Sequence, residues 1–300
     1  VLTDNEVSCF GGSNGQATAT MTGGTTPFTF LWSNGQAGTV ATGLTVGTAE
    51  VTLTDGVGCI NITTTPVTQP PVLNASIVGS VDVLCEGAAS GTINLTVLGG
   101  TTNYSYLWDD GAASTTQDLA ALSGGTYTVL VTDGNNCTAT DNVVIAEPTA
   151  ITLTAVPTDA LCNAGSDGAI NLTVDGGTTG YSFNWSNSTA SEDLAGIGAG
   201  AYNVTVTDAN NCIATITETI NQPTALTLTP TAVNANCGQS DGAVSVTVSG
   251  GTINYGYVWS DPGSATSSAV NGLPASSYTV TVTDGNSCVE TATIPVGNNT

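Results

Sequence analysis

The sequence has 300 residues, of which 8% are charged, and it contains 23 Asp and Glu but no Lys, Arg or His. The net charge of −23 therefore reflects missing bases rather than abundant acids. Since no cation can neutralise phosphate and no long apolar run occurs, we expect no nucleic-acid partner and no direct membrane insertion. Without an imidazole or amine for general-base or Schiff-base chemistry, we also expect that the protein is not an enzyme.

Two markers divide the chain into four units. Tryptophans recur about every 75 residues, and pairs of cysteines recur in step with them. We predict four domains, spanning residues 1–70, 71–148, 149–223 and 224–300. The first three end on Gln69-Pro70, Glu147-Pro148 and Gln222-Pro223 without a Gly/Ser-rich spacer, which favours semi-rigid linkers and an extended array. The short lead-in to Cys9 indicates that the first unit is clipped, so we expect export and anchoring signals outside this chain.

The third unit shows the strand pattern clearly. Apolar and polar residues alternate, in runs separated by turn residues such as Ser166-Asp167-Gly168. The expected strands cover residues 150–156, 170–174, 181–185, 191–197, 202–206 and 213–220. No helical period occurs. The pattern predicts an all-β fold, a tandem array of four Ig-like β-sandwich domains of about 75 residues.

Each unit also carries an aromatic strand that ends in tryptophan, at Trp32, Trp108, Trp185 or Trp259. So large an apolar load predicts that these side chains form the core of each domain. The alternative is an exposed platform that stacks against sugar rings. A tyrosine farther along three units, at Tyr127, Tyr202 and Tyr278, is typical of the tyrosine corner of sandwich folds.

The eight cysteines fall into four pairs, each about 50 residues apart, and closing such a loop stabilises a small domain by about 4 kcal/mol. Pairing across units would leave Cys9 and Cys288 without partners, because it joins 59 with 85, 137 with 162 and 212 with 237. We therefore expect one internal disulfide in each domain, and an oxidising compartment outside the cytoplasm. The expected disulfides are Cys9–Cys59, Cys85–Cys137, Cys162–Cys212 and Cys237–Cys288.

One acidic residue recurs in all four units, four positions before the second cysteine of each pair: Asp55, Asp133, Asp208 and Asp284. We interpret it as the acceptor of an Asx turn. The rival interpretation is a Ca²⁺ ligand, although no acid-rich loop accompanies it. We expect no cofactor, with Ca²⁺ the one candidate.

Several of these motifs occur together in a known family. The order is Cys, a Ser-Asp-Gly turn, paired glycines, aromatic-x-aromatic-x-Trp, Gly-x-Tyr-x-Val-x-Val-Thr-Asp, Cys and Gln-Pro. This order resembles the SprB-type repeat of large surface adhesins in gliding and other Bacteroidetes bacteria, over essentially the whole chain. Ala49 replaces the tyrosine in unit one, and unit four lacks the closing Gln-Pro. The resemblance implies an exported cell-surface protein that serves adhesion or gliding motility.

We therefore predict an extracellular stalk or fibre segment of a surface adhesin that spaces adhesive regions. Its expected partners are copies of itself in a filament, or polysaccharide and other surface ligands. The alternative function is an array of carbohydrate-binding modules that uses the aromatic strands.

Overall fold

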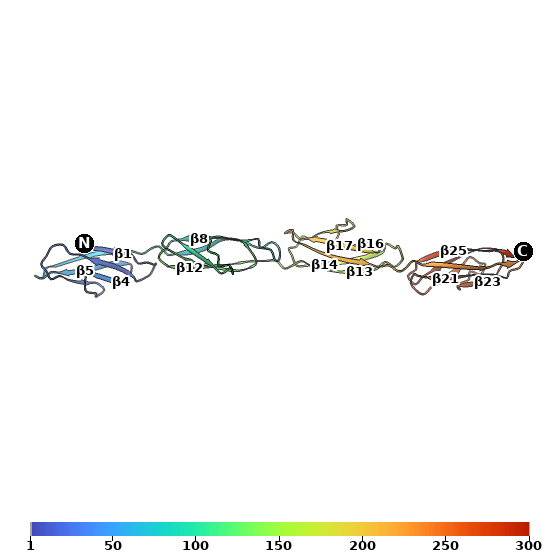
Figure 1. The fold of residues 1–300 in the computed structure, drawn as a ribbon, viewed down its shortest axis with the longest axis horizontal. Coiled ribbons are helices and arrows are strands. Elements are labelled where there is room, and N and C mark those ends of the chain that lie inside the picture. Colours follow the sequence, from blue (N-terminus) through green and yellow to red (C-terminus); the bar gives the residue numbers. More distant parts are fainter. Residues whose placement is uncertain (1, 300) are drawn as a thin grey trace. The chain divides into compact units, whose positions relative to one another are not determined.

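The computed structural model describes residues 2–299, and every regular element in that range is a β-strand (Figure 1). The chain divides into two compact units, Val1–Pro148 and Thr149–Thr300. Each unit holds two groups of strands, which we call repeats 1 and 2 in the first unit and repeats 3 and 4 in the second. The four predicted domain ranges stay predictions, but no strand pairing among residues 2–299 crosses their limits.

Repeat 1 contains β1 (Leu2–Asn5), β2 (Gly15–Ala19), β3 (Thr29–Trp32), β4 (Val40–Leu44), β5 (Gly47–Thr54) and β6 (Ile60–Val67). Repeat 2 contains β7 (Asn74–Val81), β8 (Gly91–Leu98), β9 (Ser105–Trp108), β10 (Leu119–Leu122), β11 (Gly125–Thr132) and β12 (Thr138–Ile145).

Repeat 3 contains β13 (Thr152–Thr158), β14 (Gly168–Asp175), β15 (Ser182–Trp185), β16 (Leu194–Ile197), β17 (Gly200–Thr207) and β18 (Ile213–Ile220). Repeat 4 contains β19 (Thr227–Val233), β20 (Ala235–Asn236), β21 (Gly242–Ser249), β22 (Gly256–Trp259), β23 (Ala269–Leu273), β24 (Ser276–Thr283), β25 (Val289–Val296) and β26 (Asn298–Asn299).

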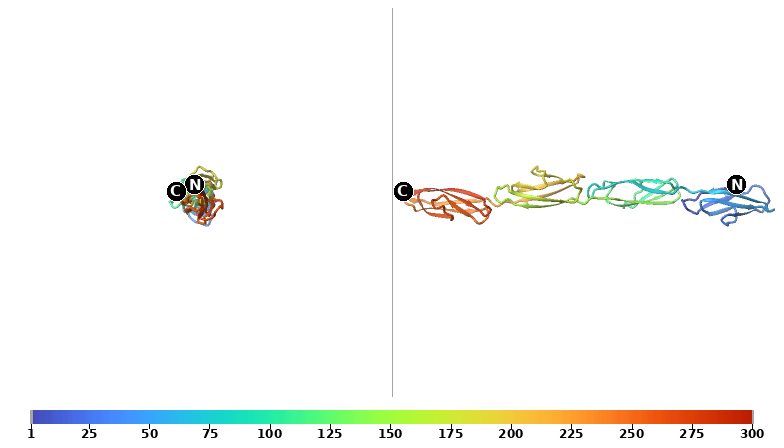
Figure 2. Two further views of the ribbon diagram at one scale, coloured as in Figure 1. Left: turned by 90° about the vertical axis from the view of Figure 1, so that its right-hand side faces the viewer. Right: turned by 180° about the vertical axis from the view of Figure 1, so that it is seen from behind.

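The same pair of three-stranded sheets occurs in every repeat. In repeat 1 the sheets have the orders β1-β2-β4 and β3-β5-β6, and repeats 2 to 4 have the equivalent sheets. All pairings in these sheets are antiparallel, whereas β20 and β26 add a short parallel pair in repeat 4. The right-hand view of Figure 2 shows the strands of each repeat from behind. The all-β, Ig-like sandwich predicted from the sequence is confirmed.

The core of each repeat lies between its two sheets and contains the tryptophan. In repeat 3, Trp185 is 2% exposed and packs with Ile170 and Leu172 of one sheet and with Val204 and Val206 of the other. Its indole nitrogen donates a hydrogen bond to Ser191 O at 3.0 Å, so the buried polar atom is satisfied. Trp32, Trp108 and Trp259 are buried in the same way and donate to Gly38 O, Thr116 O and Ser267 O.

The predicted strands of repeat 3 agree well with the structure at the closing strand, where β18 covers the predicted residues 213–220. The first strand was predicted two residues too early. The backbone of Thr149 and Ala150 instead lies against a glycine turn, and the Gly177 N–H donates to Thr149 O at 2.9 Å. These residues therefore leave the strand pairing before β13 begins.

The prediction of one internal disulfide in each domain was wrong. Cys9 bonds to Cys137 and Cys162 bonds to Cys288, while Cys59 and Cys237 are free. Cys85 and Cys212 are disulfide-bonded as well. The structure thus excludes all four expected pairs, Cys9–Cys59, Cys85–Cys137, Cys162–Cys212 and Cys237–Cys288.

The length of a strand explains why. In repeat 1 the Val7 N–H donates to Thr68 O, just past the end of β6, so Cys9 lies near that end. Cys59 directly precedes the start of β6, and eight extended residues span about 26 Å. Disulfide geometry requires two Cα atoms within about 7 Å, which this separation far exceeds. The Val83–Ala146, Ala160–Asn221 and Ala235–Gly297 hydrogen bonds give the other repeats the same arrangement.

No helix within residues 2–299 is long and apolar enough to cross a membrane.

Candidate functional site: the junction between repeats

The first component of the junction is the linker residue before proline. In repeat 1 the Gln69 side-chain oxygen accepts a hydrogen bond from the Gly11 N–H at 2.8 Å. In repeat 3 the Gln222 side-chain oxygen accepts one from the Ala164 N–H at 2.7 Å. Glu147 is bonded to the Gly87 N–H in the same way. Each of these amides lies two residues after a cysteine, so the linker is fastened to the cysteine loop of the repeat that it leaves.

The second component is a glycine turn of the repeat that the linker enters. The Gly100 N–H donates to Pro71 O at 2.9 Å. At the preceding glycine, Gly99, φ is +72° and a Cβ atom would lie 1.9 Å from Val72 O. Only glycine fits so close to a backbone carbonyl in this conformation. Gly250 and Gly251 hold the backbone of Thr224 and Ala225 identically in repeat 4.

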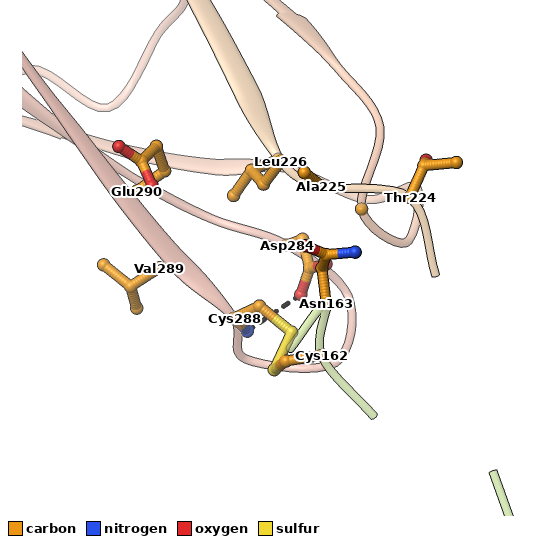
Figure 3. A pocket seen from close by; sticks show the side chains of 10 residues that line it. Cys162, Asn163, Thr224, Ala225, Leu226, Asp284, Cys288, Val289 and Glu290 are labelled. Carbon is orange, nitrogen blue, oxygen red and sulfur yellow. Dashed lines mark hydrogen bonds between the residues drawn. A yellow bond between two sulfur atoms is a disulfide. The ribbon is translucent and has the colours of Figure 1, made fainter. Parts of the chain in front are cut away.

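The third component is the disulfide, which joins consecutive repeats. Cys9 lies in the loop between β1 and β2 of repeat 1, and Cys137 directly precedes β12 of repeat 2. The Cys162–Cys288 disulfide joins the equivalent positions of repeats 3 and 4 (Figure 3). The Cα atoms are 5.7 Å apart in both bonds. Repeats 1 and 2 are thus connected twice, once by the linker and once by a disulfide, and so are repeats 3 and 4.

An asparagine supplements each disulfide. The Asn135 side-chain amide donates to Ser8 O of repeat 1 at 3.0 Å, and it also donates to Thr101 Oγ1 within its own repeat. At the other junction, the Asn286 amide donates to Leu161 O at 2.9 Å. The accepting carbonyl belongs in both cases to the residue just before the disulfide cysteine. The amide therefore helps to orient the cysteine loop toward its partner.

The recurrent aspartate positions the second cysteine of each repeat. In repeat 4, Asp284 Oδ1 accepts the N–H groups of Asn286 and Cys288, both at 2.9 Å, and Oδ2 accepts that of Thr252 at 2.8 Å. Asp284 is 5% exposed. The pKa of this carboxyl lies below its ordinary value, chiefly because of the hydrogen bond from Thr252. Burial opposes this shift, and the bonds from Cys288 and Asn286 add to it.

Asp133 and Asp208 make the same three hydrogen bonds in their own repeats, and Asp55 makes them in a less buried setting. Burial alone would raise the pKa of Asp133, but the N–H groups of Thr101, Cys137 and Asn135 outweigh burial and lower it. The pKa values of Asp208 and Asp55 are lowered chiefly by the N–H groups of Thr178 and Thr25. The Asx-turn interpretation of the series therefore describes its geometry.

The same geometry provides N–H partners for the carboxylates. N–H donors already point at both oxygens of each carboxylate, whereas Ca²⁺ needs several oxygen ligands. Within residues 2–299 no three acidic, histidine or cysteine side chains gather as a metal site. The weak candidacy of Asp55, Asp133, Asp208 and Asp284 as Ca²⁺ ligands stays a prediction.

Hollows lie beside the Cys9–Cys137 disulfide and beside the Cys162–Cys288 disulfide. The hollow at Cys162–Cys288 has a volume of about 210 Å³ and includes Leu226, Asp284 and Glu290 in its lining (Figure 3). The hollow at Cys9–Cys137 has a volume of about 380 Å³ and is lined by Phe10, Val72 and Leu73 among others. Neither lining contains a histidine, lysine or arginine, because the chain has none.

The other predicted site residues lie away from the junction. The tryptophans are in the cores, where no sugar ring reaches them. Tyr127, Tyr202 and Tyr278 form the predicted tyrosine corners, since each hydroxyl donates to the carbonyl four residues upstream at 2.9–3.0 Å. The sequence placed Gln69 and Gln222 in the linkers, but it did not predict that their side chains accept hydrogen bonds from the cysteine loops. Their recurrence before proline was the signal that could have revealed them.

Comparisons with known proteins agree with the internal repetition. A family model described as the SprB repeat matches four regions of the chain, residues 3–37, 78–113, 154–190 and 229–264. A search of curated proteins found no match.

Several solved structures are similar over most of their length. One is a tetra-tandem repeat in the extending region of a large adhesion protein, with 14% identity, 98% of both chains covered and a TM-score of 0.30. Invasin, a bacterial integrin-binding protein, has 14% identity over 99% of this chain and 79% of its own, with a TM-score of 0.33. A Ca²⁺-stabilised ice-binding adhesin of an Antarctic bacterium has 17% identity over 100% and 99%, with a TM-score of 0.30. At such low TM-scores, none of the three indicates what this chain binds.

Proposed function

This chain is a tandem array of four SprB repeats, and we propose that it serves as a spacing segment of a large extracellular adhesin. The segment holds adhesive regions at a distance from the cell and turns over no substrate. Its sequence resemblance to the repeats of gliding bacteria extends the proposal to adhesion or gliding motility of Bacteroidetes cells. A surface location agrees with the disulfides, since such bonds persist in oxidising compartments.

The observation that carries this proposal is the twofold connection between consecutive repeats. A linker alone is a single covalent hinge about which two domains rotate. Here the Cys9–Cys137 bond adds a second covalent connection, and the Gln69 and Asn135 side chains fasten the loops on either side of it. Two connections restrict bending and twisting, which is what a spacer requires.

The alternative, an array of carbohydrate-binding modules, has lost its main support. It relied on the aromatic strands, but Trp32, Trp108, Trp185 and Trp259 are all 2% exposed or less. The remaining aromatic residues of these strands pack partly buried against the same cores. We expect tryptophan fluorescence to stay unchanged when polysaccharides are added, whereas a shift in emission would favour the carbohydrate-binding alternative.

Small-angle X-ray scattering of the oxidised chain tests the spacing role. Domains about 30 Å long that follow one another in line span on the order of 120 Å. The radius of gyration of such a rod is roughly 35 Å, whereas a single globule of this chain length has roughly 19 Å. A value near 35 Å supports the proposal. A value near 19 Å contradicts it, because repeats folded back on one another hold no distance.

A further inference from the structure

Cys59 and Cys237 are the free cysteines among residues 2–299, and both are exposed. They occupy different positions in their repeats. Cys59 directly precedes the closing strand β6, as Cys137 and Cys288 precede β12 and β25. Cys237 lies in the loop after the opening strand, as Cys9 and Cys162 do. We call these the second position and the first position.

Cys59 is held in the same geometry as the bonded second-position cysteines. Its N–H donates to Asp55 Oδ1 at 2.8 Å, and the Asp55 N–H donates back to Cys59 O at 3.0 Å. The equivalent distances for Asp133 and Cys137 are 2.8 and 2.9 Å. The hairpin that presents a cysteine to a neighbouring repeat is therefore fully formed at Cys59.

Cys237 is likewise held as the bonded first-position cysteines are. The residue before it, Asn236, donates its N–H to Asp241 Oδ1 at 2.8 Å. The residue before Cys162, Leu161, donates its N–H to Asp167 Oδ1 at 3.1 Å. The Ala235 N–H also donates to Gly297 O, as the Ala160 N–H donates to Asn221 O. This loop presents its thiol in a form already arranged for a partner.

We propose that Cys59 and Cys237 are the two open halves of the inter-repeat disulfide, and that each bonds the complementary position of another SprB repeat. The bonds at Cys9–Cys137 and Cys162–Cys288 both join a first position to a second position of the following repeat. Cys237 therefore matches Cys59, and in the experiment below a second copy of this chain provides the complementary repeat for each. Bonds of this kind continue the array with the same junction throughout. The inference rests on the junction geometry and holds whether or not the array acts as a spacer.

The bond forms by thiol–disulfide exchange with a small oxidised disulfide such as oxidised glutathione. The thiolate of Cys59 attacks that disulfide and releases one glutathione thiol. The thiolate of Cys237 from another copy then attacks the mixed disulfide and releases the second. Two protein thiols thus lose two protons and two electrons, and one glutathione disulfide becomes two thiols.

One residue at the Cys59 end differs from the other junctions. Val57 stands where Asn135 and Asn286 donate to the carbonyl before the partner cysteine, and it is 69% exposed. In a head-to-tail junction the corresponding acceptor is Asn236 O. The Val57→Asn variant regains a donor for this carbonyl, so we expect it to form the linkage about fivefold more favourably, as one net hydrogen bond allows.

The experiment uses the full chain and two single variants, Cys59→Ser and Cys237→Ser, each incubated with reduced and oxidised glutathione. Products are separated without reductant and mapped by mass spectrometry. The wild-type chain is expected to form a ladder of multiples of 29.6 kDa whose new bond joins Cys59 to Cys237. Each variant alone is expected to stay monomeric, whereas an equal mixture of the two variants forms dimers, because only the mixture offers both positions. Both variants keep the cysteines of the existing disulfides, so both are expected to fold as the wild-type chain does. Each variant therefore controls for the folding of the other.

Three results would overturn the proposal. The first is a wild-type chain that stays monomeric with both thiols free or glutathionylated. The second is a new bond within one copy. The third is dimerisation of each variant alone as fast as dimerisation of the mixture, since this would mean that exposed thiols oxidise without positional selection.

Discussion

The inter-repeat disulfides make a quantitative prediction for the chain under tension. When the chain is pulled at its two ends, force passes from Cys9 straight to Cys137 and from Cys162 straight to Cys288. The residues between the members of each pair lie outside the covalent path of the load. Most of each repeat is thereby shielded from stretching while the disulfides are intact.

The lengths follow from the residue numbers. The covalent path contains residues 1–9, 137–162 and 288–300, which reach roughly 170 Å when fully extended at about 3.5 Å per residue with the two sulfur bridges included. Reduction releases loops of 128 and 126 residues. At about 3.5 Å per residue these loops add about 890 Å of contour length.

Single-molecule force spectroscopy with handles ligated to both ends measures these lengths. The oxidised chain is expected to stop extending near 170 Å, and the same chain in reductant is expected to extend about 890 Å farther. If each domain instead had an internal disulfide, the covalent path would also include the linkers between domains, and the oxidised chain would extend to roughly 340 Å. An oxidised extension of 340 Å or more would therefore refute the reasoning.

Three further predictions concern the parts of the junction. Gly99→Ala is expected to lower the melting temperature of the chain more than Gly111→Ala does. Both glycines have positive φ, but only at Gly99 would a Cβ atom meet Val72 O, at 1.9 Å. Equal effects of the two variants would mean that the close approach is unimportant. The pKa of Asp284 is lower in the folded chain than its ordinary value of 3.8, so this carboxylate stabilises the fold above pH 3.8 and stops doing so as the pH falls through its folded pKa. Asp284→Asn is expected to weaken the loss of stability in acid. An unchanged pH–stability profile would contradict this role. A chelator is expected to leave the melting temperature unchanged, since N–H donors occupy the carboxylates, and a large decrease would instead support Ca²⁺ ligation.

The sequence predicted best those features that depend on local pattern. Alternation alone located the strand at residues 213–220, and the aromatic spacing correctly identified Trp185 as a core residue. The tyrosine corner at Tyr202 also followed from its place before an alternating strand, and its hydroxyl donates to Gly198 O at 2.9 Å. Such features require only that neighbouring residues alternate between the two faces of a sheet.

The disulfide pairing could not be predicted from spacing, because the period of the cysteines is the same whether they pair within a repeat or between repeats. What decides it is the end of the sandwich at which each cysteine lies. That depends on the Val7–Thr68 hydrogen bond, which joins residues far apart in the chain. One signal was nevertheless present. A full closing strand separates Cys59 from the linker, whereas Cys9 follows the opening strand, so the two cysteines belong at opposite ends.

Disulfide mapping of the oxidised chain tests most directly whether disulfides join consecutive repeats. The chain has no site for trypsin, so Asp- and Glu-specific proteases would generate the peptides for mass spectrometry without reductant. We predict peptide pairs that contain Cys9 with Cys137 and Cys162 with Cys288. Recovery of Cys9 bonded to Cys59 would contradict the account.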